Sequence, residues 1–332
     1  TARGEDLTGT PADYDEIRFT MAPKTMRSGK RMMTVPFALT LATPSFVLSN
    51  PAPQFARWDT RTQTYHLFTQ SPTDSFVNRF IPGRSYWVNL ASDVALQLRG
   101  TGVPRVRQEL TFETPNTDGT LLPGWYMIGC PFDFTVDFNS LQVQYQGSNL
   151  ALGDAVTQGI VGPALYSYLN GSYAYEVAPN GRLEAFDGYW IRVLKSGVRL
   201  FALPLPSGRS AVGRATPQVA EGWLVQLSAA TRSGSDRLNC FGVSAAAGKA
   251  RLDVEEPPPA VGEEGAVALS FVRSEAGESG VRLAQEVRQG PLTRTETWEA
   301  LVEGRSGEEV ALSWGDLAAV PVGGVLAQAH IG

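Results

Sequence analysis

The segment DGYWIRVL at 187–194 has a close counterpart, SYWVNL at 85–90, earlier in the same chain. Both place an aromatic pair before alternating apolar and polar positions, which is the pattern of a β-strand with two different faces. In the later stretch the alternation divides the residues into two sets: Tyr189, Ile191 and Val193 on one face, and Trp190, Arg192 and Leu194 on the other. An arginine among apolar neighbours favours a partly solvated outer face. Because both copies carry the aromatic pair in the same context, we interpret these rings chiefly as core residues.

Two further blocks recur in the same order as the aromatic strand. The first copy contains RMMTVPF at 31–37, FARWDTRTQTYHLF at 55–68 and FIPGRSYWVNLASDVALQL at 80–98. The second copy contains GWYMIGCPFDF at 124–134, ALYSYLNGSYAYEV at 164–177 and FDGYWIRVLKSGVRLFAL at 186–203. Three matching blocks in one order indicate a tandem duplication.

Turn residues within these blocks predict hairpins. Asn170-Gly171 lies between two aromatic, alternating runs, and this dipeptide is typical of a type I′ hairpin. The first copy has Asp59-Thr60-Arg61-Thr62 instead, which predicts a longer loop between Trp58 and Tyr65.

A linker rich in Pro, Gly and Ser, LPLPSGRSAVGRATPQVAEG at 203–222, separates a third unit from the duplicated region. GWLVQLSA, AVALSFVR, TWEALVEG and EVALSWGDL then predict short strands of an antiparallel β-sandwich. EEPPPAVGEEG at 255–265 predicts a stiff, exposed loop. The predicted fold class is all-β, a tandem pair of small antiparallel β domains followed by a β-sandwich domain. The expected division is an N-terminal extension at 1–22, β repeats at 23–108 and 109–207, and the sandwich at 208–332.

Composition narrows the classes of function. Of the 332 residues, 43% are hydrophobic and 18% charged, which is typical of an ordered globular protein. The net charge of -5 without a basic stripe argues against a nucleic-acid partner. No apolar run is long enough to predict a membrane span. Cys130 and Cys240 fall in different predicted domains, so we expect two buried free thiols.

The segments GWYMIGCPF, FARWDTRTQTYHLF, PGRSYWVNL and FDGYWIRVL resemble modules of large secreted or surface-exposed bacterial proteins. Those modules carry a GWN-hydrophobic-IGNPF segment, a hairpin similar to ARYD…Y and a PGxGYWV strand. The third unit resembles the β domain that often follows them, and together the likeness covers most of residues 28–320. Cys130 stands where the pattern has Asn, and Arg31-Met32 replaces Trp-Asn. The resemblance implies an extracellular or cell-surface structural role and brings no catalytic residues with it.

Motifs for catalysis or cofactor binding are missing from the sequence. His66 and His330 are the only histidines, and there is no GxSxG, HExxH, P-loop or GxGxxG segment, so we expect neither an enzyme nor a cofactor. Calcium is the better metal hypothesis, since its oxygen ligands often come from loops of extracellular β domains. The candidate ligands lie in two predicted loops of the third unit: Asp236, Asn239, Asp253 and Glu255, with Glu256 beside them. The alternative is a solvated acidic loop with local turns.

Two further groups of residues suggest interactions. In EIRFTMA at 16–22, alternation places Ile17, Phe19 and Met21 on one side, as in an assembly strand. The strand pairs within the first domain, or alternatively completes a neighbouring subunit by strand addition. The second group is an aromatic platform for a glycan: Trp58, Tyr65, Tyr168 and Tyr173.

The leading hypothesis is a non-enzymatic structural protein, secreted to a bacterial cell surface, that forms a filament, stalk or layer by self-association or with neighbouring surface proteins. The alternative is an adhesive, carbohydrate-binding or surface-binding β module. Exposure of the platform rings separates the two hypotheses, because a glycan needs an open row of rings.

Overall fold

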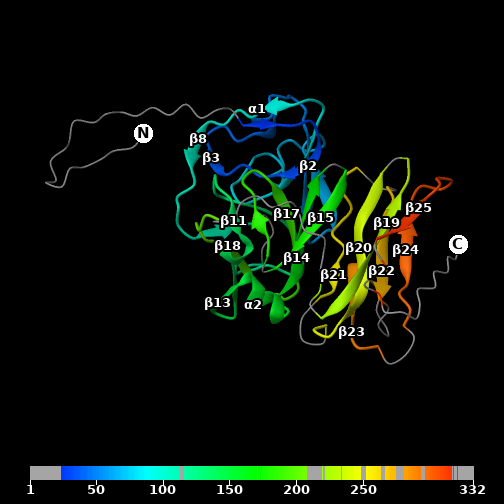
Figure 1. Cartoon of the computed structure of the whole chain (residues 1–332). Coiled ribbons are helices and arrows are strands. Elements are labelled where there is room, and N and C mark those ends of the chain that lie inside the picture. Colours follow the sequence, from blue (N-terminus) through cyan, green and yellow to red (C-terminus); the bar gives the residue numbers. More distant parts are fainter. Residues whose placement is uncertain are drawn as a thin grey trace.

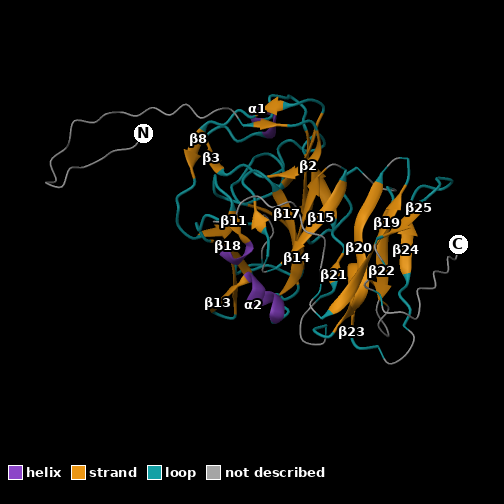
Figure 2. Cartoon of the chain, viewed as in Figure 1, coloured by secondary structure: helices purple, strands orange, loops and turns teal. Residues whose placement is uncertain are grey.

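The computed structural model describes residues 24–112, 116–169, 171–178, 180–207, 219, 221–232, 234–247, 252–262, 266–273, 280–292, 296–315, 317 and 320. Strands make up 48% of the model and helices 5%, so the predicted all-β fold is confirmed. Figure 2 shows strands throughout the described chain, with only short helices between them. The predicted assembly residues Ile17, Phe19 and Met21 lie outside the described residues.

The first module is built on a four-stranded sheet in the order β2-β6-β4-β5. Its strands are β2 (Gly29–Met33), β6 (Tyr86–Leu90), β4 (Gln54–Asp59) and β5 (Thr64–Leu67). Two small pairs complete the module, β1 (Thr25–Met26) with β7 (Val94–Ala95) and β3 (Phe37–Leu39) with β8 (Gly100–Gly102), and α1 (Pro44–Val47) follows β3. Asp59 pairs with Thr64, so a four-residue loop closes the first hairpin as predicted.

The second module repeats this arrangement in a sheet of order β10-β17-β14-β15. Its strands are β10 (Gly124–Gly129), β17 (Gly188–Val193), β14 (Val161–Leu169) and β15 (Ser172–Val177). A second sheet has the order β13-β12-β18-β9, from β13 (Ser148–Ala151), β12 (Leu141–Tyr145), β18 (Arg199–Ala202) and β9 (Gln108–Leu110). The smaller elements are β11 (Val136–Asp137), β16 (Arg182–Leu183), η1 (Phe138–Ser140) and α2 (Leu152–Thr157). The main sheets of the two modules therefore share one strand order, as copies of one unit would.

The hairpin predicted around Asn170-Gly171 joins β14 and β15. Leu169 pairs with Ser172, and Gly171 has a φ of 82°, a left-handed conformation that glycine adopts without strain. The predicted two-residue hairpin connection is confirmed.

The third unit is one seven-stranded sheet in the order β24-β22-β23-β20-β19-β25, with β21 added beside β23. Its strands are β19 (Gly222–Ala230), β20 (Ser235–Ser244), β21 (Val254–Glu255), β22 (Ala268–Arg273), β23 (Val281–Gln289), β24 (Ala300–Glu303) and β25 (Ala311–Trp314). The sheet curls around a core in which the rings of Phe241 and Phe271 lie 5.6 Å apart. Pairing of β20 with β23 is parallel, which differs from the wholly antiparallel sandwich predicted, because the pair is not joined by a hairpin.

Each member of the repeated aromatic pair faces a different core. Tyr86 lies in the core of the first module and Tyr189 in that of the second. Trp87 and Trp190, both fully buried, lie in a separate core that also contains Val254 and Ala260 of the third unit. Figure 1 shows the first module (blue to cyan), the second (green) and the third unit (yellow to red) packed together. On the face that we expected to be partly solvated, Trp190 is covered by the other copy and the third unit, whereas Arg192 and Leu194 are partly exposed.

The two modules meet through equivalent residues, as in a dimer with twofold symmetry. Thr34 N donates to Phe186 O at 3.0 Å, and the equivalent Gly129 N donates to Gly83 O at 2.9 Å. A bridge joins Met33 to Asp187, and the equivalent bridge joins Ile128 to Arg84. Each contact therefore occurs twice with the roles of the modules exchanged, which is the property of an isologous interface.

Side chains at this pseudo-twofold contact come in complementary sizes. A Cβ on Gly129 would lie 2.4 Å from Thr34 Cβ, and a Cβ on Gly188 would lie 1.8 Å from Ser85 Oγ. Thr34 and Gly129 are equivalent positions of the two copies, and so are Ser85 and Gly188. At each point, one copy has glycine where the other has a small hydroxyl residue.

Candidate functional site

The paired modules form a continuous aromatic face. We define this aromatic face by eight residues of six strands: Trp58, Tyr65, Trp87, Tyr166, Tyr168, Tyr173, Tyr175 and Trp190. These side chains share a face because strand residues two apart point the same way. The hairpins β4–β5 and β14–β15 bring the face of each copy to the same side.

Rings from the two modules contact one another directly across the aromatic face. The ring centroids of Trp58 and Trp190 lie 6.1 Å apart at an interplanar angle of 84°. Trp87 lies 4.8 Å from Tyr168 and 6.1 Å from Tyr173, again edge to face. Edge-to-face pairs of this kind add about 0.5–1.5 kcal/mol beyond their buried area.

A proline-rich segment of the third unit fills the aromatic face. We call residues 254–261 the proline segment, and it includes Pro257, Pro258 and Pro259. Three tyrosine hydroxyls donate to its carbonyl oxygens: Tyr166 to Glu255 at 2.9 Å, Tyr173 to Pro258 at 2.7 Å and Tyr65 to Pro259 at 2.7 Å. Proline lacks an N–H, so its carbonyl is the only backbone group available for hydrogen bonding. The donors come from both modules, so the segment fastens the third unit to the two copies.

The prediction that this proline run is exposed is wrong. Pro257 and Pro258 are buried, Ala260 is 3% exposed and Pro259 alone among these residues is exposed. Burial removes the hydrogen bonds that the carbonyl groups of the run would make to water. The run can be buried because these carbonyl groups accept hydrogen bonds from tyrosine hydroxyls instead.

The four residues predicted as a glycan platform all belong to the aromatic face. Tyr168 is 2% exposed, and Trp58, Tyr65 and Tyr173 are half-buried. Tyr65 and Tyr173 use their hydroxyls on the proline segment. The structure therefore brings the predicted rings together, and the chain itself covers them.

Polar contacts surround the aromatic face. Arg192 Nε donates to Glu255 Oε2 at 2.6 Å, and its guanidinium lies 5.9 Å from the centre of the Trp125 ring. Tyr175 Oη donates to Gln285 Oε1 at 3.1 Å, and Gln285 Nε2 donates to Leu252 O at 2.6 Å. These bonds hold the amino-terminal end of the segment, and the residues just before it, against β15 and β17.

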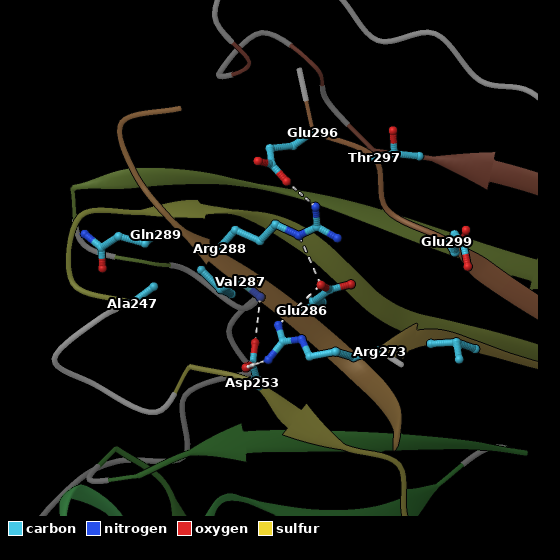
Figure 3. Close-up of a pocket in the computed structure, with 11 residues that line it drawn as sticks. Ala247, Asp253, Arg273, Glu286, Val287, Arg288, Gln289, Glu296, Thr297 and Glu299 are labelled. Atoms are coloured by element: carbon cyan, nitrogen blue, oxygen red, sulfur yellow. Dashed lines mark hydrogen bonds and ion pairs between the residues drawn. The ribbon is translucent and has the colours of Figure 1, made fainter. Parts of the chain in front are cut away.

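The third unit carries a charged hollow of about 590 Å³ (Figure 3). Arg273 lies 2.5 Å from Asp253 and 3.3 Å from Glu286. Arg288 lies 3.1 Å from Glu286 and 2.5 Å from Glu296. Each guanidinium in the hollow binds two carboxylates, so an anionic ligand would have to displace an internal partner. This alternating network links β22 and β23 to the residue before β21 and to the chain before β24.

The predicted calcium ligands do not form one cluster. Asn239 Nδ2 donates to Asp236 Oδ1 at 2.8 Å, which brings these two together. Asp253 pairs with Arg273 and Glu255 with Arg192, so each of these carboxylates faces a cation. Over the described ranges, no three His, Cys, Asp or Glu residues are grouped to hold a metal ion.

Two neighbouring acids of the third unit, Asp236 and Glu256, have raised pKa values. Burial, with a smaller contribution from the charge of Asp236, raises the pKa of Glu256 well above its usual range, against the opposing effect of Arg282. Burial also raises the pKa of Asp236, although Leu269 N and Asn239 donate to its carboxylate. The sequence predicted both acids in loops, as calcium ligands or alternatively in solvent, and did not indicate these pKa shifts, because the surroundings of the two acids come from distant strands.

The remaining candidates from the sequence, His66, Cys130 and Cys240, contact other residues of the folded chain or are buried in it. His66 Nδ1 lies 2.5 Å from Asp74 Oδ2, and its ring stacks on Phe76 at 4.1 Å. Cys130 and Cys240 are free and buried, as predicted. Burial raises the pKa of the Cys130 thiol to about 12 and that of Cys240 to about 11.

Comparison of the chain with protein families, with curated proteins and with solved structures gave no match. Within the described residues, no helix has the length and apolar character that crossing a membrane would require.

Proposed function

We propose that this chain is a non-enzymatic structural protein of a bacterial cell surface, secreted from the cell, which associates with further copies or with neighbouring surface proteins. The first support is the connection between its three units. Paired backbones join the modules, and the proline segment joins the third unit to both of them. Units that share a core in this way resist hinge motion, which suits a building block.

The proposed self-association is supported by an exposed edge strand in the sheet of the third unit. In the part of the chain that the structure describes, β25 is bonded to β19 alone and forms one end of the sheet. All four of its residues are exposed, including Leu312 at 45% and Trp314 at 56%. An edge strand presents unpaired N–H and C=O groups that another strand can bind, and exposed apolar side chains favour that contact.

The other end of the sheet has a similar character. β24 pairs with β22 on one side, and Leu301 of β24 is 38% exposed. Within the described residues both end strands of this sheet have one free edge, so a copy can bind on either side, as a chain of subunits requires. The glycan alternative has no comparable support, because the proline segment covers the rings that would form its platform.

Light scattering across a concentration series, with electron microscopy of the same samples, tests this proposal. We expect the mass of the wild-type particle to rise with concentration and Trp314→Lys to prevent the rise, because a charge on an edge strand opposes pairing. The matched control is Val106→Lys, since Val106 is 59% exposed and lies away from this sheet. A wild-type chain that stays monomeric at every concentration, or a Trp314→Lys chain that assembles normally, would contradict the proposal.

A further inference from the structure

The proline segment has the chemistry of an extended, preformed ligand. Each proline fixes its φ near −65°, and a residue before proline is driven away from the helical region. Glu256, Pro257 and Pro258 all precede a proline, so the run favours the polyproline II conformation. Such a ligand loses little conformational entropy when it binds, and it presents carbonyl groups that need donors.

The aromatic face supplies the matching groups. Tyr65, Tyr166 and Tyr173 direct hydroxyls at three carbonyls of the segment, while tryptophan rings lie between them. Aromatic grooves with polar donors are a recurring means of binding proline-rich peptides. The contacts to the proline residues use ring surfaces and main-chain carbonyls, which any extended proline-rich peptide possesses.

A second layer of contacts orients the donors. Trp190 Nε1 donates a hydrogen bond to Tyr173 Oη at 3.2 Å. The Tyr173 hydroxyl in turn donates a hydrogen bond to Pro258 O. Edge-to-face packing of Tyr173 on Trp87 and Tyr168 holds its ring. The ring and hydroxyl of Tyr173 are therefore held by residues of both modules.

The aromatic face also continues beyond the segment. A groove of about 470 Å³ lies beside Val254, between the second module and the third unit, and Trp125, Pro163, Tyr166 and Arg192 contribute to its wall. Arg192 at this end already binds the acidic residue that precedes the prolines, Glu255. The site thus distinguishes the two ends of a peptide, with the acidic end toward Arg192 and the proline end toward Tyr65.

We infer that the aromatic face is a binding site for an extended proline-rich peptide with an acidic residue before the prolines, and that the chain's own proline segment occupies it. This property goes beyond the proposed structural function and does not depend on self-association. The occupant is part of the same chain, so its effective concentration is high and an external peptide competes poorly with it. Weakening the internal occupant opens the site to a peptide of the same sequence.

The test uses the full chain in which Pro257, Pro258 and Pro259 are each replaced by Gly, which keeps the length and removes the preformed conformation. The probe is a labelled synthetic peptide, LDVEEPPPAVG, with the sequence of residues 252–262. We expect fluorescence anisotropy to show binding to the triple variant at concentrations that leave the wild-type chain unbound. A peptide with three glycines in place of the prolines is the matched probe, and we expect it not to bind.

Adding Tyr173→Phe to the triple variant removes one hydroxyl and leaves the ring, so we expect affinity for the peptide to fall about fivefold. A triple variant with the near-ultraviolet circular dichroism of the wild type that binds neither peptide would overturn the inference. Equal binding of the two peptides would overturn it as well.

A second measurement applies if the triple variant does not fold. Hydrogen exchange at the Ala260 and Val261 amides is compared between the wild type and the Tyr65→Phe, Tyr173→Phe double variant. We expect faster exchange in the double variant, because two of the three tyrosine hydroxyl bonds to the segment are lost. Unchanged exchange would mean that the hydroxyls do not hold the segment, and it would also overturn the inference.

Discussion

The contact between Thr34 and Gly129 gives the sharpest prediction about how the duplicated modules fit together. A Cβ on Gly129 would lie 2.4 Å from Thr34 Cβ and 2.7 Å from both Thr34 Cγ2 and Thr34 Oγ1. Hydrogen bonds from both residues' backbone N–H groups limit relaxation. Overpacking in such a site costs about 1–3 kcal/mol, and we expect Gly129→Ala to lie near the upper end.

Removing the opposing side chain should relieve this clash. Thr34→Gly alone should cost about 1–2 kcal/mol, from lost burial and from the added freedom of glycine in the unfolded chain. The three atoms nearest to a Cβ on Gly129 all belong to the Thr34 side chain, so the combined Thr34→Gly, Gly129→Ala chain loses these clashes. We expect its loss of stability to stay at about 1–2 kcal/mol, which corresponds to a favourable coupling of about 3 kcal/mol.

Urea unfolding followed by tryptophan fluorescence measures these free energies. Gly102→Ala is the matched control, because a Cβ there meets nothing within 4 Å and should change stability by less than about 0.5 kcal/mol. Additive effects of the two substitutions would refute the reasoning, since they would mean that Thr34 and Gly129 do not oppose each other.

Two further predictions concern titratable groups. Burial raises the pKa of Cys130 to about 12 and that of Cys240 to about 11. We therefore expect neither thiol to react with Ellman's reagent in the folded chain and both to react after unfolding. A fast-reacting thiol in the native protein would contradict this. The pKa of Glu256 is raised on folding, so the native state binds the proton more tightly and stability falls as pH rises from the unfolded value of 4.5 through the folded pKa. The side chain of the Glu256→Gln variant is neutral at every pH. In denaturant titrations we expect the stability of this variant relative to the wild type to increase between about pH 5 and pH 8. A relative decrease would show that the folded chain favours the charged form of Glu256.

The repeated aromatic strand shows which structural features a local sequence pattern can predict. Alternation in DGYWIRVL correctly separates Tyr189 from Trp190, because the direction of strand side chains depends only on the local backbone. What covers the tryptophan face is not a local property. The covering elements are another copy of the same module and a third unit, and their docking depends on the shapes of complete sheets.

The proline segment illustrates the same limit. Its sequence predicts a stiff, extended conformation, but the prediction of exposure failed because the donors to its carbonyls are distant in the chain. Tyr166, Tyr173 and Tyr65 are separated from their acceptors by 89, 85 and 194 positions. The aromatic composition of both copies indicated a platform, and only the structure identifies its occupant.

Cross-linking at the edge of the third unit tests the proposed association between copies of this chain. Ser313→Cys places one exposed thiol on β25, while Cys130 and Cys240 are buried. Under mild oxidation we expect a covalent dimer whose yield rises with protein concentration, and no dimer from Val106→Cys, which exposes a thiol on a different surface. Failure of Ser313→Cys to form dimers at concentrations where light scattering detects assembly would contradict this edge as the contact, and equal yields from the two variants would mean that collisions alone produce the cross-link.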